Sequence, residues 1–170
     1  MNVFDFAMEM EDNGYVYYSN LARTATLPGL KTIFSSLAED ERKHFKLFRE
    51  LKAGNDEWSM AETETLVTAK NVFSLLPRSE ELSEISGVLP AYKHAMQLEA
   101  DSFRFYEDAA EKESDPKVKA VLLKIAGEEH QHFNILENLY NFVNAPNQHL
   151  EWGEFSNLGE FRQYGRDIDI

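Results

Sequence analysis

One set of residues recurs in this sequence at a constant separation of 88 positions, as in 99 − 11 and 132 − 44. Each half contains a lone glutamate followed by a Glu-x-x-His motif. The repeated pairs are Glu11 and Glu99, Tyr18 and Tyr106, Pro28 and Pro116, Ala38 and Ala126, Glu41 and Glu129, His44 and His132, and Phe45 and Phe133. Four carboxylates and two imidazoles are a donor set that suits a pair of transition-metal ions. The repeat therefore predicts two similar halves that share one kind of site.

The spacing of apolar residues predicts four long helices. Apolar side chains recur three and four positions apart through residues 4–25, 30–51, 91–110 and 118–143. Asp115 followed by Pro116 is typical of a helix N-cap and a first-turn proline. The short links near Pro28 and Asp115 predict two antiparallel hairpins. We therefore expect an all-α fold, an antiparallel four-helix bundle made of two helical hairpins.

The remaining segments define the expected domain organisation. At 170 residues and 43% apolar content, the chain is long enough for one domain with a substantial core. Residues 1–146 are expected to form the bundle, with residues 54–89 as a long crossover between the hairpins. Residues 147–170 are rich in turn-forming and aromatic residues. We expect them to form a strap over the bundle or a partner subunit, not a separate domain.

The six candidate ligands fall on the apolar faces of the predicted helices. The four expected seams are Phe4, Met8, Glu11, Tyr15, Tyr18 and Ala22; Leu30, Phe34, Leu37, Glu41, His44, Phe48 and Leu51; Ala95, Glu99, Phe103, Tyr106 and Ala110; and Val118, Leu122, Ile125, Glu129, His132, Leu136 and Leu139. Buried carboxylates without a compensating charge are costly. The pattern therefore predicts metal ligation by Glu11, Glu41, His44, Glu99, Glu129 and His132.

Other residues near the seams have subsidiary expected roles. Tyr18 and Tyr106 are placed to donate hydrogen bonds to ligand carboxylates. Alanines, together with Gly14 and Ser102, leave space near the ligands where packing alone would favour large side chains. The acidic runs 9–12 and 39–41 are expected to be solvated apart from their ligand members. His94, His130 and His149 are expected to have surface or structural roles.

Composition excludes several classes of function. The net charge of −13 argues against binding to nucleic acid or to an anionic membrane surface. The sequence contains no cysteine, so its residues cannot form a disulfide, a thiolate zinc site or a cysteine-ligated iron centre. The first residues have neither a basic stretch nor a long apolar run. A soluble cytoplasmic protein is the expectation.

These motifs resemble those of the ferritin-like superfamily, most closely the rubrerythrin-like di-iron carboxylate proteins. The resemblance covers about residues 2–144 and is carried by residues 10–18, 37–44, 98–106 and 126–132. It implies two iron ions per chain, although the same ligands suit manganese. It also implies bridging by Glu41 and Glu129, terminal ligation by Glu11 and Glu99, and one histidine per ion. Such proteins oxidise iron(II) and react with hydrogen peroxide or dioxygen.

Two departures from that family pattern modify the expected function. The sequence lacks the cysteines of a rubredoxin domain, so a separate electron donor protein is expected, and Ser102 stands where rubrerythrins carry an additional carboxylate. We expect a homodimer. One alternative is a bacterioferritin-like iron storage cage, although Arg42 occupies the position of that family's haem-binding methionine. Another alternative is a metal-free helical scaffold.

Overall fold

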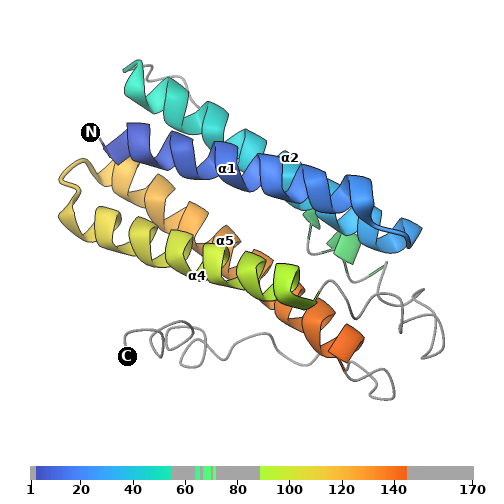
Figure 1. Cartoon of the computed structure of the whole chain (residues 1–170). Coiled ribbons are helices and arrows are strands. Elements are labelled where there is room, and N and C mark those ends of the chain that lie inside the picture. The colour runs from blue at the N-terminus through green and yellow to red at the C-terminus, as the bar shows by residue number, and fades with distance from the viewer. Residues whose placement is uncertain (1–2, 55–63, 66, 70, 72–88, 145–170) are drawn as a thin grey trace. The chain divides into compact units, whose positions relative to one another are not determined.

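The computed structural model describes residues 3–54, 64–65, 67–69, 71 and 89–144. Four long α-helices account for most of them (Figure 1): α1 (Val3–Thr24), α2 (Pro28–Lys52), α4 (Leu89–Lys112) and α5 (Pro116–Asn144). No strand occurs within these ranges. The all-α prediction is confirmed, and each helix begins and ends within two residues of its predicted bounds.

The helix termini follow the signals in the sequence. The Oδ1 atom of Asp115 accepts hydrogen bonds from the backbone N–H groups of Lys117 at 2.8 Å and Val118 at 3.4 Å. Asp115 is therefore the N-cap of α5, as predicted, and Pro116 lies in the first turn. After the C-terminal end of α2, Gly54 adopts a left-handed backbone conformation with φ 71°. Glycine accepts this conformation without steric strain and ends the helix.

The chain divides into two units, residues 1–76 with 115–121 and residues 77–114 with 122–170. In the first, α1 and α2 run antiparallel, so that the ring of Phe4 lies 6.4 Å from that of Phe48 near one end. In the second, α4 and α5 also run antiparallel (Figure 1). There Lys93 Nζ lies 5.4 Å from the centre of the Tyr140 ring. Both predicted hairpins are present. The expected strap and most of the expected crossover lie outside the described residues.

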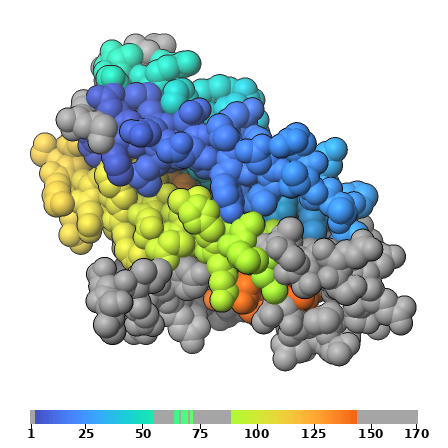
Figure 2. All heavy atoms as spheres, in the orientation of Figure 1, coloured from blue at the N-terminus to red at the C-terminus, as the bar shows by residue number. Residues whose placement is uncertain are grey.

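The predicted apolar seams are correct for α2 and α4, where every seam residue is buried. The seam of α1 is wrong at Tyr15, which is 39% exposed. The buried face of α1 is centred on Ala7, Glu11, Tyr18 and Ala22. Position 15 lies at the edge of this face, where a tyrosine can bury part of its ring and keep its hydroxyl group in water. The outward side chains of α1 are visible in Figure 2 (blue).

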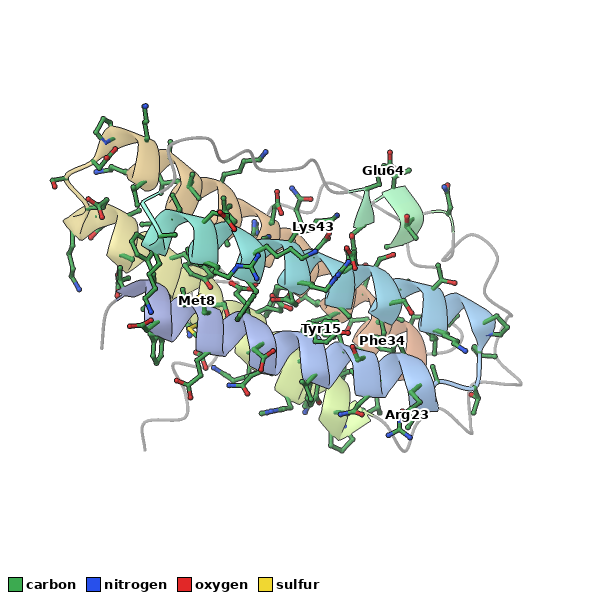
Figure 3. The ribbon with its side chains drawn as sticks, turned by 90° about the horizontal axis from the view of Figure 1, so that it is seen from above. Met8, Tyr15, Arg23, Phe34, Lys43 and Glu64 are labelled. Carbon is green, nitrogen blue, oxygen red and sulfur yellow. The ribbon has the colours of Figure 1, made fainter. Side chains whose placement is uncertain are left out.

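Asp40 contradicts the expectation that the acidic run 39–41 is solvated outside its ligand member. Its side chain is only 1% exposed. Asp40 accepts hydrogen bonds from the hydroxyl of Thr65 and from Nζ of Lys43, the latter at 2.9 Å. Thr65 follows Glu64 and begins a partly described helical segment (Figure 3). The carboxylate of Asp40 therefore fastens this segment to α2.

Replacing Asp40 should destabilise the first unit. Asp40→Ala removes the acceptor of the buried Thr65 hydroxyl and of the Lys43 ammonium group, so we expect the free energy of unfolding to fall by about 2 kcal/mol. Glu39→Ala is the matched control, because Glu39 is a neighbouring acid in an exposed ion pair with Arg42. Urea unfolding should show a lower midpoint for Asp40→Ala alone. Equal midpoints for the two variants would contradict the role of Asp40.

The burial of Tyr92 predicts that the free energy of unfolding depends on pH. Its side chain is 2% exposed, and burial raises its pKa above 10.0, the usual value for tyrosine. The unfolded chain therefore loses this proton at a lower pH than the folded chain, and stability falls as pH rises above 10. Phenylalanine has no proton to lose, so Tyr92→Phe should not show this fall in stability. The free energy of unfolding of Tyr92→Phe minus that of the wild type should therefore rise, from its value at pH 8, by about 1.4 kcal/mol for each pH unit above 10. A difference between the two proteins that is the same at pH 8 and pH 11, measured by urea unfolding, would disprove this.

Candidate metal centre

The α1–α2 hairpin gathers three of the predicted ligands. Glu11 lies in the middle of α1, while Glu41 and His44 lie one turn apart on the same face of α2. The Nδ1 atom of His44 is 3.3 Å from Oε2 of Glu11. One ligand atom from each of the three residues lies within 4.8 Å of the others. The antiparallel pairing of α1 and α2 therefore converts a separation of 30 residues, from 11 to 41, into one donor cluster.

The α4–α5 hairpin builds the same cluster from the second half of the repeat. Glu99 lies on α4, and Glu129 and His132 lie one turn apart on α5. The Nδ1 atom of His132 is 3.6 Å from Oε2 of Glu99 and 4.0 Å from Oε2 of Glu129. These three residues also offer ligand atoms within 4.8 Å of one another. The 88-residue repeat is thus a repeat of structure and not only of sequence.

Both clusters are inaccessible to bulk water. All six side chains are buried, with Glu41 the most exposed of them at 4%. Each cluster contains two carboxylates and one imidazole, so its ionised form carries excess negative charge in a setting of low dielectric constant. Such a charge is costly unless a cation compensates it. Oxygen and imidazole donors at these separations suit a divalent transition-metal ion. The two buried Glu/His clusters therefore fit a di-metal site.

The four alanines that the sequence predicts near the candidate ligands are all buried. Ala7 and Ala95, four positions before the lone glutamates, are completely buried, and Ala38 and Ala126 are also buried. On α1, Gly14 lies against the side chain of Glu41, where an added Cβ would be 3.0 Å from Oε2. At Gly14 the backbone of α1 thus approaches a candidate ligand closely, with no side chain between them.

Tyr18 and Tyr106 lie on the buried faces of α1 and α4. Each contacts the preceding aromatic residue edge to face, Tyr18 with Tyr17 at 6.0 Å and Tyr106 with Phe105 at 5.2 Å between ring centres. Burial raises the pKa of Tyr17. The inward placement of both tyrosines agrees with the sequence analysis. Their expected hydrogen bonds to ligand carboxylates stay a prediction.

The two other histidines in the described part of the chain, His94 and His130, lie outside the two clusters. His94 is exposed on α4. His130 is half-buried, with its ring 6.0 Å from that of Phe103 and its Nε2 atom 3.5 Å from the amide nitrogen of Asn134. This setting agrees with the expected structural role of His130. His149 lies outside the described residues.

Sequence reasoning missed two buried acids next to the ligands. Asp40 and Glu128 immediately precede Glu41 and Glu129, and both are buried. The available signal was the repeat itself, since 128 − 40 is again 88 and both positions carry an acid. Arg42, which follows Glu41, instead lies on the exposed side of α2 and pairs with Glu39 at 2.7 Å. This ion pair holds the pKa of the Glu39 carboxyl below its usual value.

Within the described residues, no helix is both long enough and apolar enough to cross a membrane.

Comparison with known proteins identifies the family. A family model described as Rubrerythrin matches residues 2–140, which is most of the chain. No curated protein and no solved structure matches the chain. The family match confirms the fold class, an all-α ferritin-like fold built from two helical hairpins. The buried Glu/His clusters fit the di-metal site that is typical of this family. The chain therefore belongs to the rubrerythrin family.

Proposed function

We propose that this protein is a non-haem di-iron oxidoreductase that reduces hydrogen peroxide or dioxygen. One observation carries the proposal: the two hairpins repeat a cluster of two glutamates and one histidine, and all six side chains are buried. Six such donors in two-fold repetition match the needs of two ions. Membership of the rubrerythrin family supports the same conclusion.

In this proposal the six ligands divide into three pairs. Glu41 and Glu129 would bridge the two ions, Glu11 and Glu99 would each bind one ion terminally, and His44 and His132 would provide one imidazole per ion. The division follows the family resemblance. The helical spacing supports joint binding by Glu41 with His44 and by Glu129 with His132, because each pair lies one turn apart on one helix face. Iron is proposed over manganese on the family match, since the donor types suit both.

A pair of iron(II) ions held by these residues would supply the two electrons that reduce peroxide to water. The chain provides the conditions for that chemistry. Burial of the six ligands excludes bulk water, which strengthens every charge interaction in the site. The hydroxyls of Tyr18 and Tyr106 would orient ligand carboxylates by donating hydrogen bonds to them. Because all six ligands are buried, we propose that only a small oxidant reaches the ions.

Turnover also needs a source of electrons. The 170 residues contain no cysteine with which to hold a rubredoxin-type iron centre, so we propose a separate electron donor protein. The strongly acidic composition favours a donor with a basic contact surface. We further propose that the protein acts as a homodimer in the cytoplasm, where it would remove peroxide or handle iron.

The first test is metal stoichiometry. After anaerobic loading with iron(II) and removal of excess metal, elemental analysis should give two ions per wild-type chain. His44→Ala and His132→Ala should each lower this value, because each removes one nitrogen donor. His94→Ala is the matched control, since His94 is an exposed histidine outside both clusters, and it should retain two ions. One ion or none in the wild type would refute the proposed centre.

The second test is reactivity. The protein is loaded with iron(II) under anaerobic conditions and is then mixed either with peroxide or with dioxygen, while the absorption of iron(III) is followed. We expect oxidation to be faster than that of the same concentration of free iron(II) in buffer. Each ligand histidine variant should lose this advantage, because a single ion supplies one electron, whereas His94→Ala should keep it. Oxidation no faster than that of free iron(II) would exclude the proposed activity.

A further inference from the structure

Gly14 occupies an unexpected place for a glycine. It lies in the middle of α1, where glycine destabilises a helix relative to alanine because it loses more backbone freedom on folding. Its backbone conformation does not require glycine: among the described glycines only Gly54 has a positive φ. Some other property of a missing side chain must explain its presence at this position.

The side chain of Glu41 supplies the explanation. A Cβ added at Gly14 would lie 3.0 Å from Oε2 of Glu41 and 3.2 Å from both Cδ and Cγ. These separations are closer than ordinary van der Waals contact, so the Glu41 side chain would have to shift by a few tenths of an ångström. The carboxylate of Glu41 therefore occupies the space that any larger residue at position 14 would take.

We propose that Gly14 is a positioning residue for Glu41. Its missing side chain lets the Glu41 carboxylate lie directly against the backbone of α1, where it shares a donor cluster with Glu11 and His44. The inference rests on the proposed function, because it matters only if Glu41 binds metal. Metal–ligand distances are held within about 0.2 Å, so a displacement of a few tenths of an ångström is large for a ligand.

The contact also distinguishes the two halves of the repeat. The residue 88 positions after Gly14 is Ser102, so α4 carries a side chain at the corresponding place. At this position of the repeat, glycine therefore occurs only in the half that contains Glu41. We infer that the first half depends on close approach of the α1 backbone to a carboxylate.

The chain contains a matched control for this inference. Gly127 is also a glycine inside a helix, two positions before Glu129, but a Cβ added there would meet nothing within 4 Å. Gly14→Ala and Gly127→Ala thus make the same chemical change and gain the same helix propensity. They differ in whether the new methyl group meets a metal ligand.

The experiment compares these two variants with the wild type as whole chains. Anaerobic titration with iron(II) gives the metal affinity, and the visible bands of bound cobalt(II) report the ligand geometry. We expect Gly14→Ala to bind iron(II) about tenfold more weakly or worse, as for other residues that orient ligands, with altered cobalt bands. Gly127→Ala should match the wild type in both measurements. Equal binding by all three proteins, or equal weakening in both variants, would overturn the role of Gly14.

A second measurement needs no metal and covers the case in which Gly14→Ala folds poorly. In the metal-free protein, Gly14→Ala is compared in the wild-type and Glu41→Ala backgrounds. Without the Glu41 side chain the new methyl group has space, so Gly14→Ala should raise the melting temperature as Gly127→Ala does. In the wild-type background it should raise it less or lower it. The same shift in both backgrounds would show that Gly14 does not act through Glu41.

The outcomes separate this inference from the proposed function. A wild-type protein that binds no iron(II) would refute the proposed function and this inference with it. A wild type that binds two ions, together with a Gly14→Ala variant that binds them equally well, would refute only the inference.

Discussion

The structure depends on the burial of six ionisable side chains inside otherwise apolar helix faces. Each buried carboxylate loses several kcal/mol of hydration free energy, which apolar neighbours cannot replace. The α1–α2 hairpin nevertheless brings Glu11 to within 3.3 Å of His44, and the α4–α5 hairpin repeats the arrangement. Packing alone would not select such residues at such positions. The antiparallel pairing of long helices brings donor side chains that are far apart in the sequence into the same cluster.

This constraint extends to residues that do not belong to the clusters. Glu41 and Asp40 are adjacent in α2, so their side chains leave the helix in different directions. Glu41 joins the donor cluster, while Asp40 receives hydrogen bonds from Lys43 and from Thr65 in the segment after the hairpin. α2 therefore carries a buried acidic residue on each of two faces, and the two residues have different partners. A helix held on two sides presents its candidate metal ligands in a fixed direction, which is what a preorganised site needs.

The sequence predicts the helices and the donor clusters because both follow from helical periodicity, which fixes which residues share a face. Asp40 escapes prediction because its partner, Thr65, comes from a segment with weak periodicity. Tyr15 is misplaced because a seam with steps of three and four includes its edge positions, where exposure depends on the neighbouring helix. The role of Gly14 also cannot be predicted from periodicity. The sequence indicates that space is left beside the candidate ligands, but only the three-dimensional structure shows that the side chain of Glu41 fills this space.

The repeat preserves the donors more strictly than their surroundings. Each half supplies the same glutamate and Glu-x-x-His pattern, yet Gly14 corresponds to Ser102, and the Tyr17–Tyr18 ring pair corresponds to Phe105–Tyr106. Identical donors fix which ions can bind, because ligand type and number set that choice. Neighbouring residues instead set how tightly each carboxylate is held and which polar groups surround it. Two ions in such a centre would therefore share a ligand set but not an environment, and their affinities and oxidation would differ accordingly.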